Sequence, residues 1–193
     1  EPVNDPADGE DETDDGGELH VGDGYAYATP QAAYKASASG DTIVVHDGTY
    51  SFSGNEWYTR YNEEAPIHIQ HNIRFVGEGD VTFDIGSVAK GALVTREAKN
   101  ADVYVENITF QGANNTDFNA AGIRHQDGDL TVVNSRFVGN QNGILGGGEG
   151  HTTRIKDSTF QDNGHGAGRS HAIYINEGAE LVVEGSTFTG TNV

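Results

Sequence analysis

Four segments of the chain share an alternation of apolar and polar residues and end in the same short signature. They are residues 103–112, 130–140, 153–163 and 181–190. An alternation with a period of two is typical of β-strands. One phenylalanine anchors each segment, and these anchors are 27, 23 and 28 residues apart: Phe110, Phe137, Phe160 and Phe188. Short strands that recur at a period in the twenties predict a solenoid of stacked repeats.

A strand that returns above itself after one coil pairs in parallel, about 4.8 Å further along the axis. Equivalent residues of successive repeats are then expected to stack, so the four phenylalanines form one internal ladder. A second, aliphatic ladder is expected from Ile123, Ile144 and Ile173. A polar stack at a corner of the coil, each amide bonding the next, is expected three residues before the phenylalanines, from Asn107, Asn134 and Asp157.

The segment ATPQAAYKASASGDTIVVHDGTY, residues 28–50, indicates a short helix followed by a first strand and turn. Thr29 is suited to the N-cap, Pro30 to the first helical position, and Gly40 follows the expected helix over residues 29–39. The segment resembles the opening of right-handed parallel β-helix proteins, the broad pectate-lyase-like group. The resemblance covers residues 19–193, because the repeats continue it.

The resemblance implies an all-β fold, a single-stranded right-handed parallel β-helix with a short N-terminal capping helix and an uncapped C-terminal end. It is informative about fold and says little about function, because the group includes lyases, hydrolases, epimerases, phage spikes, adhesins and structural proteins.

The amino-acid composition limits the classes of partner that the protein is expected to bind. The 193 residues include 30 acidic and 11 basic side chains, and the net charge of −19 argues against binding nucleic acid or an anionic membrane. It also disfavours a polyanionic polysaccharide unless cations bridge the like charges. The chain has no cysteine and no apolar run of transmembrane length. It begins at Glu1 and contains no methionine, so we expect a secreted protein, extracellular or on the cell surface, whose signal peptide was removed. A chain that was trimmed at its start would look the same.

Residues 1–18 contain nine acids and no base, and we expect a tail or strap there, followed by one domain over residues 19–193. Carboxylate oxygens are ligands for Ca²⁺. The candidate calcium ligands are Asp5, Asp8, Asp11, Asp14 and Asp15. The alternative is a charge run that is merely solvated.

The last repeat is followed at once by Val193, with no capping helix. Either the sequence is cut from a longer protein, or a partner covers this end of the coil. An uncapped parallel coil is a template for another chain, and identical subunits that stack head to tail form filaments when the contact does not close. We therefore expect an extracellular structural protein whose subunits build a filament or surface fibre. Its tail is expected to contact the neighbouring subunit, and the expected interface residues are Val3, Leu19, Phe188 and Val193.

The alternative function is a polysaccharide lyase or epimerase that acts on acidic glycans. The resemblance implies either a base beside a calcium-binding carboxylate cluster or a Tyr/His pair. The candidate residues are His165, Arg169, His171 and Tyr174, with His125 on the corresponding strand of an earlier coil. Histidine suits a base, tyrosine an acid, and arginine a partner for a uronate carboxylate. No lyase-type carboxylate cluster recurs on consecutive coils, so we expect that the protein is not an enzyme.

A third hypothesis is a carbohydrate-binding or adhesive module. Residues 55–64 contain the single tryptophan beside two tyrosines, and aromatic faces suit the apolar faces of pyranose rings. The candidate binding residues are Trp57, Tyr58 and Tyr61. An interface patch or a lid on the core would use the same residues. The expected partners are therefore further copies of this chain and an extracellular polysaccharide.

Overall fold

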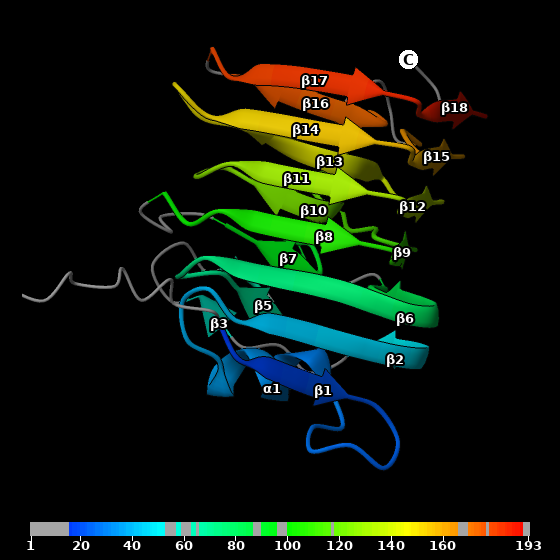
Figure 1. Ribbon diagram of the computed structural model, residues 1–193. Coiled ribbons are helices and arrows are strands. Elements are labelled where there is room, and N and C mark those ends of the chain that lie inside the picture. The colour runs from blue at the N-terminus through cyan, green and yellow to red at the C-terminus, as the bar shows by residue number, and fades with distance from the viewer. Residues whose placement is uncertain are drawn as a thin grey trace, which may run out of the picture.

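The structure, a computed structural model, describes residues 16–52, 57–58, 63–64, 66–86, 90–95, 100–116, 118–165, 170–176 and 178–190, without the side chains of residues 57–58 and 63–64. Parallel sheets dominate this part of the chain and curl into a half-barrel (Figure 1). Strands pair with the equivalent strands of the neighbouring repeats. The predicted all-β class and the parallel stacking are therefore confirmed, and the curl is compatible with a solenoid.

The larger sheet bends at a corner, which divides its strands into two parts that meet at β6. We call these two parts the faces of the larger sheet. One face has the strand order β1-β2-β6-β8-β11-β14-β17, and the other has the order β6-β9-β12-β15-β18. The bounds are β1 (Glu18–Val21), β2 (Thr42–Ser51), β6 (Ile73–Asp84), β8 (Val103–Glu106), β9 (Thr109–Gln111), β11 (Leu130–Val133), β12 (Arg136–Val138), β14 (Thr152–Lys156), β15 (Thr159–Gln161), β17 (Glu180–Glu184) and β18 (Thr187–Thr189).

The smaller sheet has the order β5-β7-β10-β13-β16, and the core lies between it and the larger sheet. Its strands are β5 (Ile67–His68), β7 (Leu93–Val94), β10 (Ala121–His125), β13 (Asn142–Gly147) and β16 (Ile173–Asn176). A separate antiparallel pair joins β3 (Trp57–Tyr58) to β4 (Glu63–Glu64). We call the three strands at one level of the stack a rung. Two of them come from the two faces of the larger sheet, and the third comes from the smaller sheet.

The predicted phenylalanine ladder is confirmed. Strand pairing aligns Phe110 with Phe137, Phe160 and Phe188, and successive ring centroids are 5.1, 4.7 and 4.9 Å apart with the rings nearly parallel. The ladder continues to Phe83 through an edge contact at 5.4 Å. The stack forms because parallel pairing brings the same position of each repeat into register.

The predicted aliphatic ladder is also confirmed. Ile123, Ile144 and Ile173 are aligned along the smaller sheet, and Leu93 and Ile67 extend it. Ile123 and Ile144 are fully buried, whereas Ile173 on the last described rung is partly exposed. The two ladders together form the centre of the core.

The predicted polar corner lies between the two faces of the larger sheet. Asn107, Asn134 and Asp157 have φ angles of 55°, 45° and 50°, in the left-handed region that Asn and Asp tolerate. The Asn134 side-chain amide donates a hydrogen bond to Asn107 Oδ1 at 3.4 Å. The amide of Asn107 donates in turn to the Gly77 carbonyl at 2.8 Å. The amide stack is therefore confirmed for the asparagine pair.

A serine ladder, which the sequence analysis missed, lies beside this corner. Ser135 Oγ accepts from the Ile108 amide at 3.3 Å, Ser158 Oγ from the Ser135 amide at 3.1 Å, and Ser186 Oγ from the Ser158 amide at 3.1 Å. Its signal in the sequence is a serine two residues before the ladder phenylalanine in three repeats. The ladder satisfies backbone amides where the strands are interrupted.

A buried asparagine ladder follows the second face of the larger sheet. Asn140 Oδ1 accepts from the Ala113 amide at 3.0 Å, and its Nδ2 donates to the Phe110 carbonyl at 2.9 Å. Asn163 repeats this one rung further, accepting from the Asn140 amide at 3.1 Å and donating to the Phe137 carbonyl at 2.8 Å. These side chains replace the backbone partners that the turn lacks.

Helix α1 (Pro30–Ala36) covers the core at the N-terminal end of the sheets (Figure 1). Thr29 is the N-cap as predicted, and its side chain accepts from the Ala32 amide at 3.2 Å. Ala33 is fully buried against the core. The predicted capping role of this helix is therefore confirmed.

The predicted extent of the helix, residues 29–39, is wrong at its end, because the helix stops at Ala36. Ser37 is extended, with φ −78° and ψ 157°, and its amide donates to the last turn. The Ala38 amide then donates to the Asp41 carboxylate at 2.7 Å, which holds the chain in a turn into β2.

Strand β1 was not predicted. It pairs in parallel with β2, so the expected boundary between tail and domain, after residue 18, falls at the first residue of this strand. Residues 1–15 lie outside the described part of the chain.

Candidate functional sites

The rung formed by β16, β17 and β18 exposes apolar side chains that face inward. Leu181, Val183 and Phe188 are 42%, 41% and 41% exposed. Their partners in register one rung below are at most 2% exposed: Thr153, Ile155 and Phe160. Leu181, Val183 and Phe188 lie on the last described rung, and no strand of the described residues covers them. We call this surface the apolar rung.

The opposite end of the stack also exposes apolar groups. Ala32 and Ala36 lie on the outer side of α1 with Ala28 just before it, and all three are exposed. Tyr25, in the loop that follows β1, is 48% exposed. We call the three alanines the alanine face. Lys35, on the same helix beside Ala32 and Ala36, is also exposed and borders this face.

The predicted interface residues divide between these ends and the undescribed segments. Phe188 belongs to the apolar rung, and Leu19 is partly buried and packs against the core. Val3 and Val193 lie outside the described residues. The hydrogen bond from the Tyr27 amide to the His20 carbonyl, 3.2 Å, occupies part of the outer edge of β1.

Two of the predicted catalytic residues lie together. The rings of His171 and Tyr174 stack with centroids 5.3 Å apart, and the His171 amide donates to Asn142 Oδ1 at 2.9 Å. Tyr174 is 41% exposed on the outer side of β16. His165 is exposed in the segment after β15, and Arg169 lies outside the described residues.

The structure does not bring His125 to this pair. Tyr174 is in register with Leu145 and Arg124, whereas His125 occupies the next position, which faces the interior. Its Nε2 donates to the Gly128 carbonyl at 2.6 Å, and its Nδ1 accepts from Thr95 Oγ1 at 2.9 Å. Burial lowers the pKa of His125 to about 4. This histidine is a neutral, fully bonded structural group.

An unpredicted cluster lies where β1, β2 and β6 meet. His20 Nδ1 is 3.0 Å from His46 Nε2, and Tyr25 stacks on the His46 ring at 3.7 Å. Carboxylates lie at both outer nitrogens: Glu78 Oε2 is 3.2 Å from His46, and Glu18 Oε2 is 3.5 Å from His20. The arrangement ties the first strand and its loop to the sheet. Nothing in the sequence pattern indicates this cluster, because His20 and His46 both lie outside the four repeated segments.

A groove of about 330 Å³ crosses the outer side of β6, β8, β11 and β14. One row of its lining comes from residues that strand pairing places in register: Arg74, Tyr104, Thr131 and Arg154. The sequence analysis did not single out this row. Its signal is positional, because Tyr104, Thr131 and Arg154 each precede their ladder phenylalanine by six residues.

Several predicted site residues cannot be placed. The side chains of Trp57 and Tyr58, and all of Tyr61, lie outside the described part, as do the predicted calcium ligands Asp5, Asp8, Asp11, Asp14 and Asp15. Among the residues whose positions are described, no group of three or more His, Asp or Glu side chains is arranged to hold a metal ion. Within the same described residues, no helix is long and apolar enough to cross a membrane.

Comparisons with protein-family models, with curated proteins and with solved structures found no match.

Proposed function

We propose that this protein is an extracellular structural protein, a right-handed parallel β-helix whose copies stack head to tail into a filament or surface fibre. The observation that carries the proposal is the apolar rung, where Leu181, Val183 and Phe188 are each more than 40% exposed. The right-handed form is supported by the strong preference of parallel β connections for that hand.

The proposed contact joins the apolar rung of one copy to the alanine face of the next. Both surfaces are apolar, and they lie at opposite ends of the same stack (Figure 1). Strands β17 and β1 are the two ends of one parallel sheet, so a shift along the axis brings β17 toward β1 of the next copy. Such a contact joins different surfaces and does not close, which produces a filament.

Side-chain packing is the main part of this contact. Tyr27 already pairs with Val21 at the outer edge of β1, so strand pairing between copies is limited to the start of that strand. Burying apolar surface contributes about 25 cal/mol per Å², and the short alanine side chains let the Phe188 ring and the two branched side chains of the rung approach closely.

Two further parts of the proposal concern the environment. The acidic residues 1–18 are proposed to contact the neighbouring copy, with Ca²⁺ as the ion that offsets their charge. Secretion is supported by the excess of acidic residues, which suits a saline or calcium-rich exterior.

The test is sedimentation velocity of the full chain as a function of concentration. Val183→Glu places a charge on the apolar rung and is expected to leave monomers. The matched control is Val182→Glu, since Val182 is the next residue on β17 and faces the other side, in register with Arg154. This control is expected to assemble like the parent. A parent chain that stays monomeric at high protein concentration would refute the proposal.

Head-to-tail stacking makes a second prediction that a two-fold contact does not. Ala32→Glu changes the alanine face at the third helical position, where a carboxylate favours the helix N-terminus. Each variant alone is expected to be monomeric, because each lacks one surface. An equal mixture of Ala32→Glu and Val183→Glu is expected to form dimers, because one intact surface of each remains. Dimers of Ala32→Glu alone would show a contact between two apolar rungs instead.

A further inference from the structure

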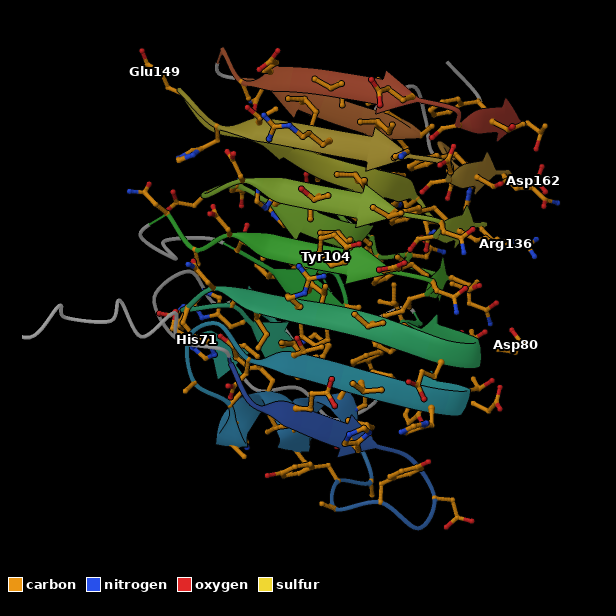
Figure 2. All side chains as sticks on the ribbon, viewed as in Figure 1. His71, Asp80, Tyr104, Arg136, Glu149 and Asp162 are labelled. Carbon is orange, nitrogen blue, oxygen red and sulfur yellow. The ribbon has the colours of Figure 1, made fainter. Side chains whose placement is uncertain are left out.

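The groove on the larger sheet is lined by one aromatic ring, Tyr104. Figure 2 shows Tyr104 at the middle of this sheet, on β8. The guanidinium carbon of Arg74 lies 3.8 Å from the centroid of the Tyr104 ring, so Arg74 covers one face of the ring. Tyr104 lines the groove together with Thr131, its neighbour in register on β11, and we take the ring face turned away from Arg74 as the one available to a ligand.

The row leaves a slot beside this open face. Neighbouring strands are about 4.8 Å apart, so Tyr104 and Arg154 are two rungs, or roughly 10 Å, apart at their backbones. Thr131 lies between them and has a short side chain. The space above Thr131 therefore has the tyrosine ring on one side and Arg154 on the other. This space is wide enough for one flat ring that contacts both residues.

Polar groups at the rim of the slot are held in place. Asp129 Oδ1 accepts from the Thr152 amide at 2.8 Å, and Asp129 Oδ2 is 3.4 Å from Arg154 Nη1. The Asp129 and Arg154 side chains are 41% and 51% exposed, so the pair is open to a ligand. Arg154 can donate and Asp129 can accept hydrogen bonds at the same rim, the pattern that adjacent hydroxyl groups match.

The aromatic ring is also fixed before a ligand arrives. The Tyr104 hydroxyl donates to Glu106 Oε2 at 2.7 Å. Burial, followed by this hydrogen bond, raises the pKa of Tyr104, so the phenol stays neutral. A ring held by Arg74 on one face and by Glu106 at its hydroxyl loses little freedom on binding.

From this geometry we propose that the groove binds a neutral pyranose unit of a glycan, stacked on the open face of Tyr104 with its hydroxyl groups on Asp129, Arg154 and Thr131. Aromatic faces suit the apolar face of a pyranose ring. The charged residues lining the groove balance, since Asp102 and Asp129 offset the two arginines. The chain as a whole carries a charge of −19, which repels polyanionic glycans and leaves neutral ones unaffected.

The site lies on the side of the stack, away from the apolar rung and the alanine face. Glycan binding and self-assembly are therefore independent proposals. The monomeric variant Val183→Glu is expected to bind glycan as well as the parent, so failure of one proposal leaves the other standing.

The test is isothermal titration of the full chain with neutral tetrasaccharides of glucose, mannose, galactose and xylose, and with uronate tetrasaccharides as the charged comparison. We expect binding of at least one neutral probe, with little dependence on salt. Tyr104→Ala is expected to weaken binding about tenfold, equivalent to ~1.4 kcal/mol. Thr131→Tyr is expected to abolish it by filling the slot.

Tyr25→Ala is the matched control, because Tyr25 is an exposed tyrosine at the end of the stack, and it is expected to bind like the parent. Circular dichroism checks that each variant is folded. Three results would overturn the proposal: no neutral probe binds at millimolar concentration, only uronate probes bind, or a folded Tyr104→Ala variant binds as tightly as the parent.

Discussion

The phenylalanine ladder allows a direct comparison between one ring inside the stack and one at its end. Phe137 is fully buried, with ring neighbours at 5.1 and 4.7 Å on its two faces. Phe188 has one ring neighbour in the described residues, Phe160 at 4.9 Å, and is 41% exposed. The two residues occupy the same position of the repeat, so the change to alanine differs only in its surroundings.

The expected costs follow from these surroundings. Phe137→Ala removes a buried ring between two others and leaves a cavity, which typically costs about 3–5 kcal/mol. Phe188→Ala removes a side chain that is about three-fifths covered and leaves no enclosed cavity. Full burial of such a side chain contributes ~1.5–3 kcal/mol, so the expected cost is roughly 1–2 kcal/mol.

The assay is urea unfolding of both variants and the parent at a concentration where all are monomeric, with the slope measured for each. Phe137→Ala is expected to lower the free energy of unfolding by at least twice as much as Phe188→Ala. Equal losses would show that Phe188 is covered in the isolated chain, which would refute the exposed rung.

Three further predictions concern the interior and use the same unfolding assay. Asn140→Ala removes the side-chain donor to the Phe110 carbonyl and leaves the Ala113 amide without its side-chain acceptor, and is expected to cost about 1–3 kcal/mol; a cost below 1 kcal/mol would contradict the asparagine ladder. Gly143→Ala brings a methyl group against the Ala172 carbonyl and is expected to cost about 1–3 kcal/mol, and a variant as stable as the parent would show that the rungs can separate there. The pKa of His125 in the folded chain is about 4, against 6.5 when unfolded, so its contribution is complete above pH 6.5 and is lost as the pH falls toward 4. The stability difference between the parent and His125→Gln is expected to shrink by on the order of 3 kcal/mol over that window, whereas a constant difference would contradict the buried neutral state.

The ladders could be predicted because the repeat aligns residues of one kind. Phe110, Phe137, Phe160 and Phe188 recur at nearly constant spacing, and parallel pairing turns that spacing into contact. The serine and asparagine ladders were within reach by the same alignment. They were missed because a polar side chain next to a turn can form several kinds of hydrogen bond within that turn. Only the stacked rungs show that it bonds the next repeat.

The orientation of His125 illustrates a limit of pattern matching by residue type. Ile123 faces the core, and the period of two places His125 on the same inner side. Residue type alone groups the histidines and tyrosines of the aligned repeats, because it ignores this period. Applied to β10 and β16, the period separates His125 from Tyr174.

The groove could not be found from residue type, because its row contains two arginines, a tyrosine and a threonine. The outer side of a sheet is not constrained by the core, so its residues share no common chemistry. Only the register of β6, β8, β11 and β14 brings Arg74 onto the Tyr104 ring.

The most direct test of the proposed assembly is electron cryomicroscopy of the full chain at high protein concentration. Head-to-tail stacking predicts polar filaments in which Phe188 and Val183 of one copy pack on the alanine face of α1 in the next. Discrete particles with the apolar rung facing solvent, or pairs joined rung to rung, would contradict it.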